Sequence, residues 1–219
     1  MQHIFVDFEM TCWGSRDWVE GKRVPEIIEI GAVRLDESFK IKDSFCQYVK
    51  PEYTSLITRT CTQLTGIRDD ILKDSPLLKD AILIFNDWIG DEPVKIYSWG
   101  DDDRRQLVSE CKQKKIFDQI PVKYRRWSDF QSIFIRLFGF SRKMSLKAAI
   151  ETVDFEFEGQ QHRAVDDALN GARLLELVKD KERFSKARER IMNVYNKKEE
   201  TFTSSIGELL AGKLSSLGL

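Results

Sequence analysis

Two acidic residues interrupt an apolar run near the start of the chain, and this feature constrains the fold most strongly. Residues 4–11 read IFVDFEMT, a run of β-forming residues that predicts a strand. Asp7 and Glu9 lie two positions apart, so both side chains emerge on the same face of that strand. Adjacent carboxylates repel each other and resist burial unless a cation neutralises them. Such a pair is usually a surface feature, but its apolar flanks indicate a central strand that holds a divalent metal ion.

The hydropathy pattern of the whole chain predicts an α/β domain with a mixed sheet. Two further strands are predicted at 26–36 and 38–51, so that the first three strands form an antiparallel meander. A strand at 94–100 is predicted to run parallel to the first, because a helix connects it to the earlier strands. The other predicted elements are a fifth strand at 122–129 and helices at 77–89, 102–116, 129–138, 145–153 and 164–178. This order predicts helices that flank a mixed sheet.

The length and composition are those of one folded domain with a short extension. The 219 residues are 42% hydrophobic, which suffices for a core and is too apolar for a disordered chain. Residues 1–180 are predicted to form the domain, and residues 181–219 a helical or flexible C-terminal appendage. We expect a cytoplasmic protein without membrane attachment, because long apolar runs and signal-peptide features are missing. The four widely spaced cysteines argue against structural zinc or a disulfide framework.

The charges are divided unevenly along the chain. Residues 1–103 hold 12 basic and 20 acidic side chains, whereas residues 104–147 hold 12 basic and 3 acidic. An acidic segment followed by a basic one suggests a cation site beside a surface that binds a polyanion. The alternative is that these charges coat solvated helices. Eight residues, which we call the basic block, are candidates for phosphate contacts: Arg104, Arg105, Lys112, Lys114, Lys115, Lys123, Arg125 and Arg126.

Two further groups of polar residues extend the acidic pattern. Asp101, Asp102 and Asp103 open a predicted helix, where negative charge is favoured, and helical spacing places Asp103 on the apolar side. His162 and Asp167 are five positions apart, about 140° around a helix, and therefore cannot serve one site from within a regular helix. We expect His162 in a loop and Asp167 in the helix that follows. A loop histidine alone is usually a surface residue.

These residues together resemble a known family. The segments DFEMT, WGDDDRRQL and HRAVDDA resemble, in this order, the three motifs of the DnaQ-like, or DEDDh, 3′–5′ exonucleases. The segments FEMTCW, PEIIEIGAV, VKP and CTQLTGI are similar to the Eri-type and KapD-type branch, which acts largely on RNA. The resemblance covers residues 1–180 and implies an RNase H-like fold. The family spacing HxAxxD selects Asp167 over Asp166, and the spacing WGxxD selects Asp103.

The resemblance implies a metal-dependent hydrolysis that starts at the 3′ end of a nucleic acid and releases nucleoside 5′-monophosphates. It implies two divalent ions, Mg²⁺ or Mn²⁺, which hard oxygen ligands suit. Asp7 would bridge both ions, Glu9 and Asp167 would complete the one that activates water, and Asp103 would support the other. His162 is implied as the general base, because an unperturbed imidazole pKa of about 6.5 suits proton transfer near neutrality.

The remaining site residues and the alternatives follow from the same resemblance. Met10 and Thr11 are expected to touch the terminal sugar, Leu64 and Ile67 to contact the last base, and Trp99 or Trp13 to offer a stacking face. For each aromatic residue the alternative is core packing. RNA is the favoured substrate and DNA a possible one. A non-catalytic nucleic-acid-binding protein is a further alternative, but such proteins usually lack a ligand or the base, and here all five are present. The oligomeric state stays open.

Overall fold

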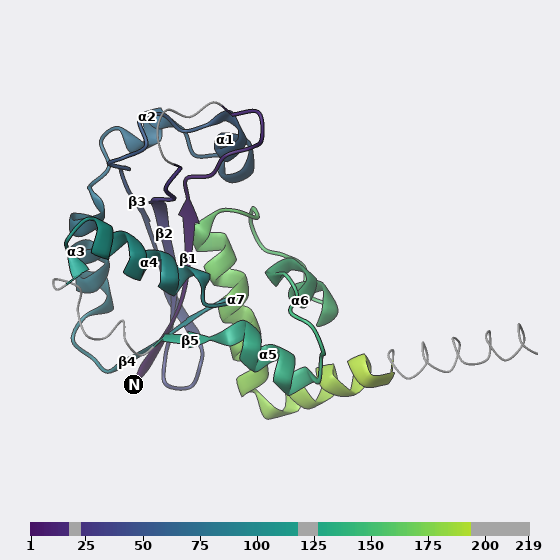
Figure 1. The fold of residues 1–219 in the computed structure, drawn as a ribbon. Helices are drawn as coiled ribbons and strands as arrows, with labels where there is room; N and C mark the ends of the chain where they lie inside the picture. The colour runs from purple at the N-terminus through teal and green to yellow at the C-terminus, as the bar shows by residue number, and fades with distance from the viewer. Residues whose placement is uncertain (18–22, 118–126, 194–219) are drawn as a thin grey trace, which may run out of the picture. The chain divides into compact units, whose positions relative to one another are not determined.

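The computed structural model describes residues 1–17, 23–117 and 127–193, and it divides the chain into two units. The first unit, Met1–Lys179, contains the sheet and the labelled helices (Figure 1). The second unit is Asp180–Leu219, in which residues 181–193 are helical.

Five strands form a single mixed sheet, as the sequence predicts. The strand order is β3-β2-β1-β4-β5, with β1 at the centre. β1 pairs with β2 and β2 with β3 in antiparallel register, whereas β4 is parallel to β1 and β5 is parallel to β4. The strands are β1 (Gln2–Met10), β2 (Ile27–Leu35), β3 (Ile41–Tyr48), β4 (Val94–Ser98) and β5 (Trp127–Asp129). Part of the predicted fifth strand, residues 118–126, lies outside the described residues.

Helices cover both faces of the sheet, and the helices predicted from periodicity are confirmed. They are α3 (Leu78–Ile89), α4 (Asp102–Gln113), α5 (Phe130–Phe138), α6 (Leu146–Thr152) and α7 (Ala164–Lys179). Two shorter helices, α1 (Arg59–Thr65) and α2 (Asp69–Leu72), occupy the connection from β3 to α3. The sequence pattern turns helical from residue 55 and is interrupted around Gly66, and the two helices lie on either side of that glycine.

The alternation of β1 assigns its two faces to different helices. Ile4, Val6 and Phe8 are buried together with apolar residues of α3 and α4. The opposite face carries Phe5, Asp7 and Glu9, and there the Phe5 ring packs edge-on against Phe130 of α5. The two acidic residues therefore lie on the face that α7 covers, where α7 contacts β1, β2 and β3.

A buried ionic cluster fixes the C-terminal end of α4. The Lys114 ammonium lies 2.8 Å from Glu110, 3.1 Å from Glu26 and 3.0 Å from Glu52. Its side chain is only 3% exposed. Glu26 also accepts hydrogen bonds from the backbone N–H groups of Glu52, Tyr53 and the next residue. The cluster therefore ties α4 to the start of β2 and to the turn after β3.

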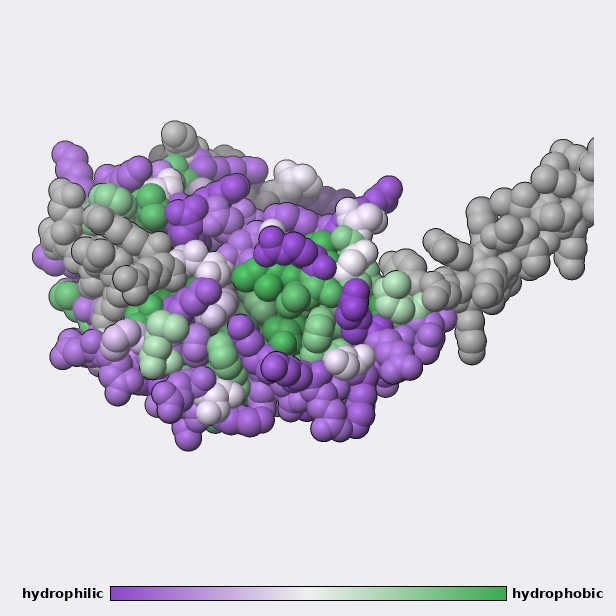
Figure 2. Space-filling model, turned by 90° about the horizontal axis from the view of Figure 1, so that it is seen from below, coloured by the Kyte–Doolittle hydropathy of each residue, from purple (hydrophilic) through white to green (hydrophobic). Residues whose placement is uncertain are grey.

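Most large hydrophobic side chains of the described residues are buried. Figure 2 shows one face of the molecule, where a compact hydrophobic patch is surrounded by hydrophilic residues. Around α1, Tyr53, Leu56 and Leu64 are exceptions that stay exposed. Within the described residues, no helix combines the length and the apolar character that a membrane crossing requires.

Replacing Lys114 with methionine is expected to lower the free energy of unfolding by about 3–5 kcal/mol, because buried carboxylates then lose their cation. Urea denaturation followed by circular dichroism measures this change. The matched control is Lys79→Met at an exposed position of α3, where we expect a change below about 0.5 kcal/mol. Similar losses in both variants would mean that the cluster adds no stability of its own.

Candidate active site

The register of the first three strands places the acidic residues in two neighbouring rows across the sheet. In one row, Asp7 of β1 lies opposite Gly31 of β2, which lies opposite Cys46 of β3. In the next, Glu9 lies opposite Glu29, which lies opposite Tyr48. Side chains two positions apart share a face, so both rows present their polar groups to α7.

Helix α7 rests directly on the backbone of β2 because Gly31 has no side chain. A Cβ atom at Gly31 would lie 2.0 Å from the carbonyl carbon of Ala164, the first residue of α7. Further along the helix, a Cβ atom at Gly171 would lie 2.1 Å from the Phe5 ring. These two close approaches fix α7 against the sheet and bring Asp167, in its first turn, over the row of Asp7.

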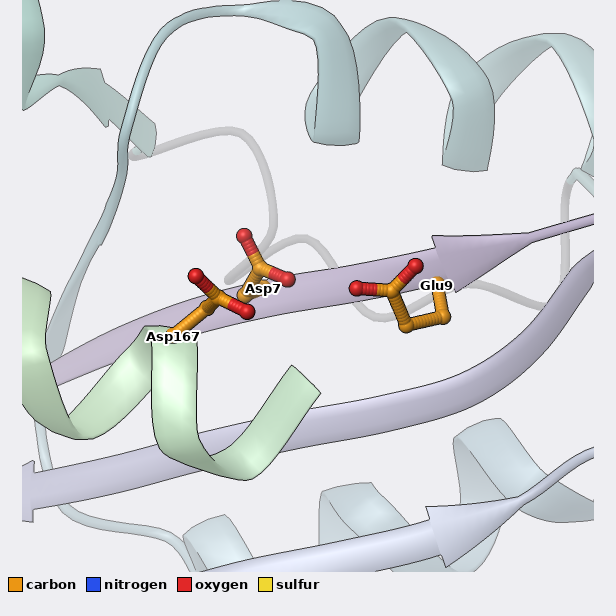
Figure 3. Close-up of side chains that lie close together, drawn as sticks. All are labelled: Asp7, Glu9 and Asp167. Carbon is orange, nitrogen blue, oxygen red and sulfur yellow. The ribbon is translucent and has the colours of Figure 1, made fainter. Parts of the chain in front are cut away.

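Three predicted metal ligands converge as a result. Ligand oxygens of Asp7, Glu9 and Asp167 all lie within 4.8 Å of one another. Figure 3 shows the two β1 carboxylates and the carboxylate from the first turn of α7 gathered on one side of the sheet. This geometry suits a divalent cation that binds several carboxylate oxygens.

Asp103 approaches the same strand from the N-terminal end of α4. It is 6% exposed, and its Oδ1 accepts a hydrogen bond of 3.1 Å from the Phe8 backbone N–H. That N–H is available because the pairing of β4 with β1 ends at Phe5 and Tyr97. Asp101 occupies the N-cap position of α4, but its carboxylate pairs with Arg104 and Arg105 and does not cap the helix.

His162 lies in the loop before α7, where the sequence placed it, and it is exposed. Its backbone has a φ of 63°, and its N–H donates to Oδ2 of Asp167 at 2.8 Å. The neighbouring Asp166 points to the other side of this turn, where its Oδ2 accepts a hydrogen bond of 2.8 Å from the N–H of Gln160. The two adjacent aspartates therefore have different partners: one faces the carboxylate cluster and the other braces the loop.

The electrostatics of the cluster favour a bound cation. Burial, reinforced by the neighbouring carboxylates, raises the pKa of Glu9 to about 8 and that of Asp7 well above its usual range. Burial likewise raises the pKa of Asp103 to about 7 and that of Asp167 to about 6. Each shift measures the cost of ionising a carboxylate in this place without a partner. The residues present therefore fit a divalent cation, which would offset both burial and repulsion.

Two further residues of this region, Glu29 and Arg163, were not predicted from the sequence. Glu29 is fully buried, and its carboxylate receives the Arg163 guanidinium at 3.1 Å and the Ala164 N–H at 3.2 Å. Arg163 also donates to the Tyr48 hydroxyl at 2.6 Å. A signal was present in the sequence, because Glu29 interrupts the apolar run IIEIGAV just as Asp7 and Glu9 interrupt theirs.

Two of the residues predicted to contact the substrate are buried. Ile67 is 1% exposed and packs inside a small cluster with Ile28, Cys61 and Leu72, so it offers no surface to a base. Thr11 is 3% exposed, and its hydroxyl accepts a hydrogen bond from the backbone of Glu26. Both residues come from stretches where core and surface positions alternate closely, which the sequence alone did not resolve.

The other predicted contacts stay predictions. Leu64 is 42% exposed and remains available. Met10 is partly buried against the core. Trp99 is held in place, because its Nε1 donates to the Met144 carbonyl and its ring packs against Phe134.

Several members of the basic block are engaged within the protein. Lys114 is buried among three glutamates, so it cannot contact a phosphate. Arg104 and Arg105 both pair with Asp101. Three further members lie outside the described residues: Lys123, Arg125 and Arg126.

Known proteins are similar to this chain in sequence and in fold. Residues 4–175 match the model of a family described as Exonuclease, RNase_T. The chain is 31% identical over 206 residues to the 3'-5' exonuclease Snipper of Drosophila melanogaster, covering 83% of this chain and 71% of that protein. It is 33% identical over 196 residues to ERI1 exoribonuclease 2 of Mus musculus, covering 78% of this chain but only 27% of that protein.

The fold is also that of a solved nuclease domain. The nuclease domain of 3'hExo, a DEDDh family member bound to rAMP, superposes with a TM-score of 0.72 at 24% identity. The match covers 81% of this chain and 90% of that domain.

We expect the stabilisation by Mg²⁺ to grow with pH. The raised pKa values mean that the metal-free folded state keeps protons on Glu9, Asp103 and Asp167 that the unfolded chain has released, so metal-free stability falls as pH rises through about 6 to 8. A cation replaces those protons, and its contribution therefore increases over the same range. Melting temperatures with Mg²⁺ and with EDTA, compared from about pH 6 to about pH 8.5, measure the difference.

His3 affects the melting temperatures with Mg²⁺ and with EDTA equally, because it is not part of the carboxylate cluster. Burial, together with nearby lysines, lowers the pKa of His3 to about 4, so this residue weakens the fold only below its unfolded pKa of about 6.5. It contributes nothing to the slope above about pH 7.5. A difference between the Mg²⁺ and EDTA curves that stays constant across the range would contradict the raised pKa values of the cluster.

The two adjacent aspartates offer a matched pair of variants. Asp167→Asn is expected to remove most of the Mg²⁺-induced rise in melting temperature, because it deletes a charged ligand from the cluster. Asp166→Asn is expected to keep that rise, since its side chain contacts the loop backbone and not the cluster. Differential scanning fluorimetry of both variants, with and without Mg²⁺, tests the assignment. The reverse result would make Asp166 the ligand.

Proposed function

The chain belongs to the exonuclease family of the RNase_T model and is a 3′–5′ exonuclease of the DEDDh type, and we propose that it shortens RNA from the 3′ end with two ions of Mg²⁺ or Mn²⁺. The observation that carries the proposal is the convergence of Asp7, Glu9 and Asp167 within 4.8 Å. Bound ions would stabilise the charge that develops during an in-line displacement at phosphorus.

The proposed roles of the residues follow from their places. Asp7, Glu9 and Asp167 would hold the ions, and Asp103 would support them from α4. The exposed His162 takes a proton from the attacking water. The water oxygen bonds to phosphorus, the bond from phosphorus to the 3′ oxygen of the preceding nucleotide breaks, and a nucleoside 5′-monophosphate leaves. Leu64, which is exposed on α1, is the proposed contact for the terminal base.

The preference for RNA is supported by the relatives. ERI1 exoribonuclease 2 carries an RNA substrate in its name, and the matched 3'hExo domain was solved with rAMP. A site that recognises RNA contacts the ribose 2′-hydroxyl, which DNA lacks. The alternative is a DNA-directed enzyme with the same chemistry, and a direct comparison of RNA and DNA substrates distinguishes the two.

The purified protein with Mg²⁺ or Mn²⁺ is expected to shorten 5′-labelled single-stranded RNA progressively and to release mononucleotides from 3′-labelled RNA. EDTA should abolish both reactions. An otherwise identical RNA that ends in a single 2′-deoxynucleotide isolates the 2′-hydroxyl, and we expect it to react more slowly. Gel electrophoresis of RNA and DNA oligonucleotides of one sequence measures the rates.

Each contrary result has a distinct meaning. Equal rates on RNA and DNA would contradict the RNA preference while leaving the exonuclease assignment intact. Intact oligonucleotides of both kinds, despite tight binding, would show a non-catalytic binding protein. Hydrolysis that persists in a metal-stripped sample would contradict the metal dependence.

A further inference from the structure

Arg163 lies between His162 and Asp167 in the sequence and is not part of the carboxylate cluster. It follows His162, the proposed base, and precedes Ala164, where α7 begins. Its carbonyl accepts the backbone N–H groups of Asp166 and Asp167, each at 2.9 Å, so the backbone of Arg163 forms the first turn that leads into α7. Any change in the placement of Arg163 therefore changes the placement of both the loop and the helix start.

The Arg163 side chain crosses the row of residues that ends at Glu9. Its Nη2 lies 3.1 Å from Oε1 of Glu29 and 2.6 Å from the Tyr48 hydroxyl. Its guanidinium carbon also lies 5.6 Å from the centre of the Tyr48 ring. Because Glu9, Glu29 and Tyr48 are opposite one another on three adjacent strands, Arg163 is held against the sheet beside the metal ligands.

Glu29 has two roles beside this arginine. Its carboxylate accepts the Ala164 N–H at 3.2 Å and so satisfies a backbone donor at the start of α7. It is also fully buried and adds to the negative charge that raises the pKa values of Glu9 and Asp167. A buried carboxylate at this position needs a cation, and Arg163 supplies it with a planar, hydrogen-bonding group.

We propose that Arg163 is a positioning residue that, through Glu29 and Tyr48, holds the His162 backbone in the conformation from which the imidazole acts. His162 has a φ of 63°, a conformation that a non-glycine residue keeps only when its surroundings fix it. Two neighbouring residues fix this conformation. The Asp167 carboxylate accepts a hydrogen bond from the His162 N–H, and the Arg163 side chain binds Glu29 of β2 and Tyr48 of β3. The proposal rests on the proposed exonuclease function.

The first test separates turnover from binding. Arg163→Met is expected to lower kcat about 10–100-fold, the usual cost of losing a supporting partner, with little change in KM or in the Mg²⁺-induced rise in melting temperature. Tyr48→Phe removes a single hydroxyl and should cause a smaller loss in the same direction. Arg163→Lys keeps the charge without the planar contacts and should fall between wild type and Arg163→Met.

The matched control is Arg34→Met, on the same strand as Glu29. Arg34 also forms an ion pair, with Asp43 at 3.0 Å, and also lies over an aromatic ring, Trp88 at 4.3 Å. Its loss should lower stability and leave kcat unchanged. A drop in kcat of equal size in both variants would show a general effect of destabilisation and overturn the proposal.

The decisive test is a double-mutant cycle with His162→Ala. If Arg163 acts through the imidazole, adding Arg163→Met to His162→Ala costs almost no further activity. Fully additive losses would overturn the proposal, as would loss of the Mg²⁺-induced rise in melting temperature in Arg163→Met, which would place the effect on the carboxylates. Because wild type is assayed alongside, an inactive wild type would count against the proposed function itself.

A measurement that does not depend on turnover distinguishes failure of the positioning role from failure of the proposed function. The chain has only 2 histidines, so the imidazole NMR signals of His162 and His3 are easily assigned. We expect Arg163→Met to shift the His162 signal and leave that of the buried His3 unchanged. An unchanged His162 signal would overturn the positioning role even if the protein proved to be no nuclease.

Discussion

The direct contact of α7 with the backbone of β2 is the constraint on which the site depends. Gly31 leaves no side chain between them, and a Cβ atom there would lie 2.0 Å from Ala164. Gly31 lies opposite Asp7, so the helix start lies over the strand next to the one that carries the acidic pair, and neighbouring strands are roughly 4.7–4.9 Å apart. A first-turn residue of α7 can then reach the carboxylates of β1, which is what Asp167 does.

Two buried carboxylates in this protein, those of Glu26 and Glu9, have pKa shifts in opposite directions, and the difference lies in their hydrogen-bond donors. Burial acts to raise the pKa of Glu26, but backbone N–H groups and the Lys114 ammonium hold that pKa below its usual range. Burial raises the pKa of Glu9 to about 8, and its carboxylate accepts no hydrogen bond from the described residues. The Glu26 carboxylate is therefore satisfied within the protein, whereas the Glu9 carboxylate keeps its lone pairs for an external cation.

The sequence predicted the parts of the fold and site that depend on local pattern. Alternation in β1 predicted the shared face of Asp7 and Glu9, and the five-residue spacing predicted that His162 lies before α7 and Asp167 within it. It did not predict that Thr11 and Ile67 are buried, because both depend on which segments pack over the end of the sheet.

Long-range pairing explains the other residues that sequence reasoning missed. Glu29 and its partner Arg163 are 134 positions apart, so no local pattern in the sequence links them. Lys114 looked like a member of a surface charge run, but its carboxylate partners include Glu26 and Glu52, which lie far away in the sequence. Strand register and chain crossovers bring these distant residues together, and neither can be predicted from composition or from spacing along the sequence.

The abrupt change from acidic to basic residues at α4 has a structural cause. A helix N-terminus favours negative charge and a C-terminus positive charge, and α4 begins with Asp102 and Asp103 and ends near Lys112 and Lys114. Its first arginines pair back to Asp101, and Lys114 closes the ionic cluster at the other end. The same helix thus carries Asp103 to β1 and is anchored at its far end. Three members of the basic block, Arg104, Arg105 and Lys114, therefore help to anchor the two ends of the helix that carries Asp103.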